Sequence, residues 1–270
     1  MQYDPIKKGL GSFFNRSPLL RILFYNLLNL LLLRTWHINK ELKKYRRDHH
    51  GPIHALDAGS GFGQYTYSLM KLSKFWKITG VDVKAEQIED CNTFINKIRK
   101  EQQVQFKVAD LTRMNDKATY DFILCVDVME HIDNDRQVFS NFVNALKPGG
   151  VILISTPSDQ GGSDVHNDTH ESFIEEHVRN GYNFTDIEEK LRSAGFSNVL
   201  SKYSYGKPGK ISWKISMKYP IIMLNWSKFF YIILPFYFIL TFPFALLLNI
   251  LDVNMIHKSG TGLIVKASIN

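Results

Sequence analysis

The chain has 270 residues, enough for one α/β domain with additions or for two small domains, and 44% of them are hydrophobic, an ordinary share for a packed core. Its formal net charge of +7 favours an anionic partner, either nucleic acid or an anionic membrane surface. The basic residues form no RNA-binding motif but flank apolar segments. This placement favours lipid headgroups over nucleic acid as the anionic partner, and the alternative is a basic face that is merely solvated. Two cysteines, Cys91 and Cys125, exclude a disulfide framework and indicate a reducing compartment, so we expect a cytoplasmic protein.

Short apolar stretches alternate with helical patterns along the middle of the chain. In chain order, strands are expected at 53–59, 76–83, 104–110, 120–128, 150–157, 196–204 and 261–269. Helices are expected at 63–75, 84–100, 134–146 and 183–196, the last with an Asn or Thr cap and a glycine stop. This alternation predicts an α/β fold with a Rossmann-like, doubly wound and mostly parallel sheet, in which a ligand binds beyond the carboxyl ends of the strands.

Acidic residues close, or nearly close, four of these strands: Asp57, Asp82, Asp110 and Asp127. A helix cap or a turn residue would explain any one of them. Because the carboxyl ends of parallel strands meet at one edge of a sheet, we expect the four together to line a single crevice.

A glycine-rich loop, GSGFG at 59–63, follows the first strand and leads into a helix. Glycines there permit positive φ and let the backbone approach a ligand, which the amide groups at the helix start then face. The spacing departs from the G-x-G-x-x-G of dinucleotide-binding enzymes, because Gln64 stands where the third glycine is expected. An NAD-binding enzyme is therefore disfavoured.

At these residues the chain resembles the class I S-adenosylmethionine-dependent methyltransferases, including the type 11 methyltransferases, over 53–204 and again over 261–269. The resemblance is carried by LDAGSGFG (56–63), VDV (81–83), VAD (108–110), YDFILCVDVMEHI (120–132) and LKPGGVILISTP (146–157). These stretches come in the family's order and at suitable spacing. The resemblance implies S-adenosyl-L-methionine as the cofactor and a seven-stranded sheet whose last strand is antiparallel.

The resemblance also assigns cofactor contacts. It places the methionine part of the cofactor at Asp57, Gly59, Ser60, Gly61 and Gly63, and the amino group near Asp127. It places the ribose hydroxyls at Asp82, with Val83 beside it, and the adenine at Asp110 and Leu111. The chemistry agrees, because a sulfonium and an ammonium favour a carboxylate-lined crevice and a diol favours a carboxylate acceptor.

The catalytic candidates follow the fourth and fifth strands. His131 is the best local base for a hydroxyl acceptor, although a histidine that packs or contacts the cofactor fits the sequence equally well. His177 and Arg179 are candidates for binding an anionic or phenolic acceptor, unless Arg179 simply pairs with a neighbouring glutamate. The order Asp127-x-x-Glu130-His131 also resembles the quinone-biosynthesis O-methyltransferases, whose matching residues are associated with a divalent metal; we keep a metal at these residues open without favouring it.

Two apolar segments frame this core. The stretch 229–248 is long enough to span a membrane, but a single crossing would separate the strand at 261–269 from its sheet. Since Pro235 and Pro243 should break the segment, a helical hairpin or shallow re-entrant insert is expected, with Lys207 to Lys228 at the headgroups. The N-terminal stretch 19–36 is expected to form one interfacial helix, with Arg34 and Trp36 at its edge. A helical cap over a soluble active site is the alternative.

These features predict four parts: an N-terminal helical segment (1–50), a methyltransferase core (51–206), an apolar helical insert (207–260) and a final core strand (261–270). We expect an enzyme associated peripherally or monotopically with the cytoplasmic face of a membrane, which methylates a lipophilic or lipid-linked acceptor, most simply on oxygen. The alternatives are a soluble small-molecule or saccharide methyltransferase with an apolar cap, and a non-catalytic cofactor-binding scaffold.

Overall fold

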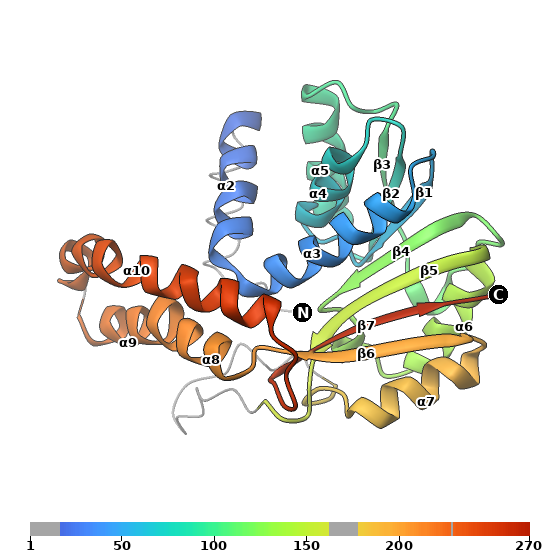
Figure 1. Ribbon diagram of the computed structural model, residues 1–270. Helices are drawn as coiled ribbons and strands as arrows, with labels where there is room; N and C mark the ends of the chain where they lie inside the picture. The colour runs from blue at the N-terminus through green and yellow to red at the C-terminus, as the bar shows by residue number, and fades with distance from the viewer. Residues whose placement is uncertain (1–16, 162–177, 228) are drawn as a thin grey trace.

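A seven-stranded sheet forms the centre of the computed structural model, which describes residues 17–161, 178–227 and 229–270 (Figure 1). The strand order is β3-β2-β1-β4-β5-β7-β6. The first five strands are parallel neighbours, whereas β7 runs antiparallel to both β5 and β6. The bounds are β1 His54–Ala58, β2 Lys77–Asp82, β3 Val104–Val108, β4 Tyr120–Val126, β5 Leu146–Pro157, β6 Asn198–Ser204 and β7 Gly262–Ser268. The predicted fold class is confirmed.

Helices cover both faces of this sheet. On one face lie α3 (Leu33–Asp48), α4 (Gln64–Leu72) and α5 (Ala85–Lys97), and on the other α6 (Asp135–Ala145) and α7 (Phe184–Ala194). Adjacent residues of a strand therefore enter different hydrophobic cores. Ala55 packs in the core under α3, α4 and α5, and Leu56 packs in the core under α6 and α7. The predicted helices are confirmed with shorter ends, and α7 has the expected cap and stop, Asn183 and Gly195.

The N-terminal segment forms two helices where the sequence predicted one. Helix α2 (Pro18–Leu31) meets α3 at 95°, because Leu32 between them is extended. The Thr35 hydroxyl donates to the Leu32 carbonyl at 2.7 Å and so stabilises the new helix start. The prediction that Arg34 and Trp36 lie at the edge of one interfacial helix is therefore wrong, since both belong to α3, which packs toward the sheet.

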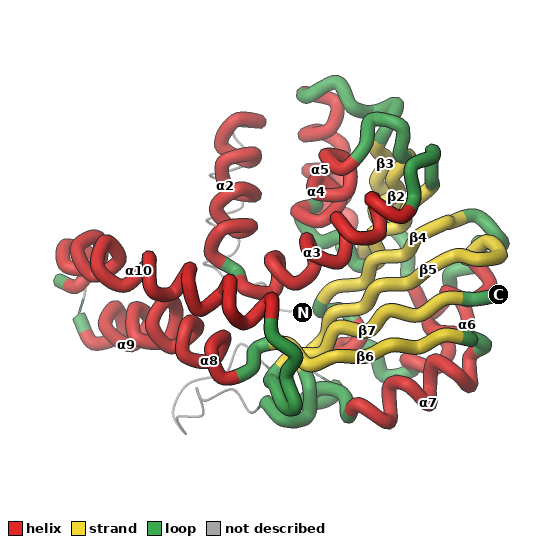
Figure 2. Tube along the Cα trace, viewed as in Figure 1, coloured by secondary structure: helices red, strands yellow, loops and turns green. Residues whose placement is uncertain are grey.

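The insert before β7 is a helical hairpin. One leg runs through α8 (Lys207–Trp213), a π-helical turn η3 (Lys214–Lys218) and α9 (Tyr219–Trp226), and α10 (Phe230–Asn254) returns (Figure 2). The hairpin is as predicted, but the break at the prolines is not, because α10 continues through Pro235 and Pro243. Packing of α10 on α8, where Ser212 Oγ donates to the Ala245 carbonyl at 3.0 Å, outweighs the loss of two backbone hydrogen bonds.

A buried carboxylate joins the hairpin to the N-terminal helices. Asp252, near the end of α10, is fully buried, and its Oδ1 lies 2.8 Å from Nε2 of His37 on α3. Its Oδ2 accepts the amide of Gly209 on α8 at 2.9 Å, and His257 lies beside it. The residue thus ties α3, α8 and α10 together next to the sheet.

Candidate active site

The glycine loop between β1 and α4 folds back onto β2. The amides of Gly59 and Ser60 both donate to the Val81 carbonyl, at 2.9 and 2.8 Å. All three glycines have positive φ, and a Cβ on Gly59 would lie 2.2 Å from Cγ2 of Val128. A side chain is therefore excluded at Gly59, where the loop passes under the turn after β4.

Asp82 fixes the loop from the end of β2. Its Oδ2 accepts the Gly61 amide at 2.9 Å and its Oδ1 accepts the Lys84 amide at 3.0 Å. A carboxylate offers about four lone-pair sites, so both oxygens keep capacity for a ligand hydroxyl. Val83 next to it is exposed at the rim.

Two residues of the loop region are buried and polar. Asp57 is 1% exposed and accepts the Thr66 hydroxyl at 2.5 Å, and burial raises the pKa of this carboxyl to about 7 although the hydrogen bond opposes the shift. The Ser60 hydroxyl is buried and has no hydrogen-bond partner among the described residues. A polar ligand in the crevice would satisfy it, so these residues fit a bound cofactor.

Asp110 caps a short helix. Its Oδ1 accepts the Thr112 amide at 2.9 Å at the start of η1 (Leu111–Arg113), and the hydrogen bonds from Thr112 lower the pKa of this exposed carboxyl. Leu111 is buried beneath it. The capping role that the sequence left open is thus present, and a contact with adenine stays a prediction.

The end of β4 carries an ion pair that the sequence did not predict. Asp127 has φ 51° and forms a salt bridge with Arg34, which reaches the site from the start of α3. The Arg34 backbone amide donates to the hydroxyl of Tyr205 at 3.0 Å, and Tyr65 of α4 interacts electrostatically with the guanidinium. A lone arginine after four leucines was the only sequence signal, and it was assigned to a membrane edge.

Comparisons with known proteins agree with this arrangement. Residues 56–152 match the family profile described as a methyltransferase domain. The chain thus contains a methyltransferase domain, and the relatives and solved structures described next support the class I S-adenosylmethionine-dependent methyltransferase family. It is similar to the ubiquinone biosynthesis O-methyltransferase of Rickettsia akari, at 24% identity over 124 residues, 46% of this chain and 48% of the relative. The corresponding protein of Rickettsia felis is 27% identical over 104 residues, 38% of this chain and 41% of the relative. The chain thus spans about half the length, or less, of these curated relatives.

Solved structures show the same fold. Phosphoethanolamine N-methyltransferase 2 of Haemonchus contortus, solved with S-adenosyl-L-methionine, superposes with a TM-score of 0.60 at 19% identity, covering 87% of this chain and 52% of that one. A putative sarcosine dimethylglycine methyltransferase from Galdieria sulphuraria gives a TM-score of 0.54 at 16% identity, covering 85% and 84%.

The residues predicted to be catalytic have different surroundings. His131 is exposed at the end of the turn η2 (Met129–His131), just past β4. Arg179 forms a salt bridge with Asp135 of α6 and donates to the Ile132 carbonyl at 2.7 Å, so it holds the loop after β5 against α6. Its pairing with Asp135 is thus described, whereas the glutamates weighed from the sequence, Glu175 and Glu176, lie outside the described residues. A role toward an acceptor stays a prediction. His177 lies outside the described residues.

The three residues considered for a metal are not gathered in the methyltransferase. Asp127 pairs with Arg34, whereas buried Glu130 accepts the Thr156 hydroxyl at 3.2 Å, and burial raises its pKa. Within the ranges that the structure describes, no group of three His, Cys, Asp or Glu residues is placed to hold an ion.

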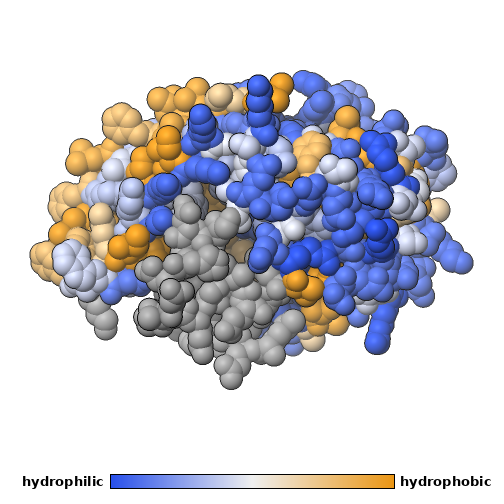
Figure 3. All heavy atoms as spheres, turned by 90° about the horizontal axis from the view of Figure 1, so that it is seen from below, coloured by the Kyte–Doolittle hydropathy of each residue, from blue (hydrophilic) through white to orange (hydrophobic). Residues whose placement is uncertain are grey.

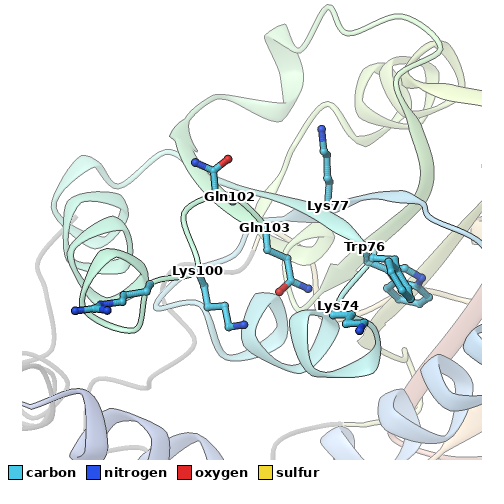
Figure 4. Close-up of a pocket in the computed structure, with 8 residues that line it drawn as sticks. Lys74, Trp76, Lys77, Lys100, Gln102 and Gln103 are labelled. Carbon is cyan, nitrogen blue, oxygen red and sulfur yellow. The ribbon is translucent and has the colours of Figure 1, made fainter.

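Two hollows among the described residues are considered in turn. The larger, about 290 Å³, lies at the amino ends of β2 and β3, far from the glycine loop, and its Lys77 and Lys100 point away from each other (Figure 4). The smaller, about 180 Å³, lies between the α2–α3 turn and the hairpin and is lined by Arg34, Tyr205 and Asn249 among others. Only the smaller one reaches the end of β4, through Arg34.

Proposed function

We propose that this methyltransferase binds S-adenosyl-L-methionine in the crevice at the strand ends and transfers its methyl group to a hydroxyl oxygen of a lipophilic acceptor. The observation that carries the proposal is the anchored loop, in which Asp82 holds Gly61 while keeping acceptor capacity for a ribose. When bound there, the cofactor would supply an electrophilic methyl carbon to the acceptor oxygen, and its sulfur would keep the electron pair of the carbon–sulfur bond as a neutral thioether. The proton released by the hydroxyl passes to His131.

Oxygen as the methylated atom is supported by the relatives, whose names describe O-methyltransferases of ubiquinone biosynthesis. A lipophilic acceptor is supported by the apolar helices beside the site. These two arguments are independent, since the first rests on similarity to relatives and the second on exposed apolar surface.

Membrane contact is supported by two exposed apolar stripes. On α2 the stripe consists of Leu19, Leu23, Leu27 and Leu30, while the opposite face buries Arg21 and Tyr25. On α10 it consists of Phe236, Leu240, Phe244, Leu247 and Leu251. Figure 3 shows apolar side chains gathered toward the end of the molecule that carries the hairpin. Such contiguous apolar surface is unusual on a soluble monomer and typical of an interfacial surface.

The charges support insertion in the plane of the interface. Helix α10 is long and apolar enough to span a membrane by length and composition, and only 11% of its apolar window is buried. The other leg of the hairpin has a much shorter uncharged stretch, which lies between Lys218 and Lys228. As a helix this stretch would be about 14 Å long, whereas the hydrocarbon core of a bilayer is about 30 Å thick. A hairpin lying along the interface keeps these lysines at the headgroups.

Cofactor binding is tested by calorimetry with S-adenosylhomocysteine and turnover by transfer of labelled methyl from S-adenosylmethionine to a lipid extract. Asp82→Ala should weaken cofactor binding more than tenfold, because it removes both a ligand acceptor and the anchor of Gly61. Retained affinity would contradict the ribose assignment. Binding without turnover on any extract would favour the scaffold alternative.

Membrane binding is tested by flotation with anionic and neutral liposomes, before and after a wash with high salt. Flotation that survives the wash is expected, because apolar burial is insensitive to screening. Protein that stays at the bottom would instead support a cap over a soluble active site.

A further inference from the structure

We infer that Arg21 and Tyr25 of α2 are positioning residues for the glycine loop, which they hold in the conformation that binds the cofactor. The inference rests on the proposed function, in which this loop forms part of the cofactor site. Both residues lie outside the stretch 56–152 that matches the methyltransferase profile. Similarity to known methyltransferases therefore assigns them no role.

The carbonyl of Phe62, which lies between two glycines of the loop, accepts two hydrogen bonds from α2. Nη2 of Arg21 donates to this oxygen at 2.8 Å, and the hydroxyl of Tyr25 donates to it as well. Nε of Arg21 also donates to the hydroxyl of Tyr25 at 2.6 Å, so each side chain holds the other in place. Arg21 and Tyr25 are 4% and 1% exposed, and water therefore does not compete for these bonds.

Helix α2 is itself fixed to α5, which gives the loop a rigid reference. Nη1 of Arg21 donates to the carbonyl of Asp90 at 3.0 Å, and the guanidinium lies over the ring of Phe94 at 4.9 Å. The ring of Tyr25 meets the ring of Phe94 edge-on at 5.7 Å. One guanidinium thus joins a carbonyl of α5 to a carbonyl of the loop.

Helix α2 also contacts the residues that follow Phe62. The hydroxyl of Tyr25 would lie 3.3 Å from a Cβ on Gly63, so the helix approaches the backbone of the loop closely. The side-chain amide of Gln64, the first residue of α4, donates to Oδ1 of Asn29 at 3.0 Å. The buried face of α2 therefore holds both the loop and the helix start that follows it.

These bonds determine which backbone groups the loop offers to a ligand. A carboxylate, such as that of the methionine part, binds to N–H groups and is repelled by carbonyl oxygens. Because the Phe62 oxygen is bonded to α2, its peptide does not turn that oxygen toward the ligand. Asp82 holds the Gly61 amide from β2. Loss of the α2 contacts should widen the range of loop conformations and lower the fraction that binds the cofactor.

The first test follows the loop without any ligand, by hydrogen–deuterium exchange on peptides that contain 59–63. Tyr25→Phe removes one bond to the Phe62 carbonyl and keeps the ring. Exchange in the loop of the full chain should become about fivefold faster, the value of one hydrogen bond. The matched control is Tyr67→Phe. Its ring lies 5.3 Å from that of Tyr25, and its hydroxyl makes no hydrogen bond to the loop among the described residues, so exchange should stay as in the parent.

The second test compares two ligands by calorimetry: S-adenosylhomocysteine and methylthioadenosine, which lacks the amino-acid part. The double variant Arg21→Met, Tyr25→Phe should bind S-adenosylhomocysteine about fivefold more weakly or worse, with less than about a twofold change for methylthioadenosine. Circular dichroism checks the fold. If Arg21→Met unfolds, Tyr25→Phe alone gives the same comparison with a smaller loss.

Unchanged loop exchange in Tyr25→Phe, or an equal loss of affinity for both ligands, would overturn the inference. The second outcome would mean that Arg21 and Tyr25 support only the fold. A parent protein that binds no S-adenosylhomocysteine would count against the proposed function, whereas the exchange experiment judges the positioning of the loop on its own.

Discussion

The four strand-end aspartates look alike in the sequence, yet each meets a different environment. Asp82 anchors a loop, Asp110 caps a helix, Asp127 pairs with an arginine, and Asp57 is buried beside one hydroxyl. Their positions follow from the strand pattern, and so does the local cap at Asp110, whose partner is Thr112. The partners of Asp82 and Asp127 do not follow from it, because Gly61 and Arg34 come from other parts of the chain.

The buried carboxyl of Asp57 should make cofactor affinity depend on pH. Its pKa near 7 means that it is mostly protonated below that pH and ionised above it, and the ionised form attracts the sulfonium and ammonium groups. Calorimetry should therefore show affinity for S-adenosylmethionine rising roughly tenfold from about pH 6 to 8, with proton release on binding.

The control for this prediction is Asp57→Asn, which keeps the shape of the side chain and removes its titration. The pH profile of affinity should then be nearly flat. The stability of the ligand-free protein should depend on pH in the opposite direction. The raised pKa of Asp57 favours the folded state at low pH, and this contribution to stability is lost as pH rises from 3.8 toward 7. If the affinity of the asparagine variant still depends on pH, the titrating group is not Asp57.

At the scale of elements, the core was predictable and the apolar segments were predictable only in part. Strands such as 120–128 and the cap and stop of α7 follow from local periodicity and turn chemistry. The bend at Leu32 and the continuous α10 do not, because contacts between α3, α8 and α10 decide them. Arg34 was misplaced for the same reason, since the bend directs it to Asp127.

The outer stripe of α10 should carry the membrane affinity. Phe236, Leu240 and Phe244 are 67%, 71% and 66% exposed, so replacing all three with serine should leave the fold intact. Flotation with liposomes should be lost, because the binding of a shallow interfacial helix depends on the apolar surface that it buries, and the three substitutions remove much of that surface.

The control is Phe75→Ser, which replaces an aromatic residue that is 61% exposed just before β2 and outside the hairpin. It should float like the parent. Circular dichroism of both variants checks the fold, and a triple variant that is folded and still floats would assign the membrane affinity to α2.

At the scale of the whole molecule, Asp252 connects parts of the chain that are distant in sequence. Burial lowers the pKa of His37 despite its carboxylate partner, whereas the pKa of Asp252 is lowered by hydrogen bonds from His37 and Gly209 in spite of burial. Both shifts act in the same direction on stability. Each contribution is present at neutral pH and is lost as pH falls, first below about 6.5 for the histidine and later for the aspartate.

The contribution of His37 to the melting temperature should accordingly fall between about pH 7.5 and 5.5, a step that the opposite contribution of Asp57 partly offsets in the same range. His37→Gln should reduce this step, whereas His50→Gln, at an exposed position, should leave it unchanged. Thermal unfolding followed by near-ultraviolet circular dichroism measures the difference. An identical step in both variants would show that the acid sensitivity arises elsewhere.

The position of β7 in the sheet bears on the order in which the protein is made. Its partners β5 and β6 are both synthesised earlier, yet they do not pair with each other and must wait for it. The hairpin lies between β6 and β7 in the chain, so a ribosome releases the most apolar segment while the sheet still has an open gap. The hairpin of the nascent chain is thus exposed before the domain to which it belongs is complete.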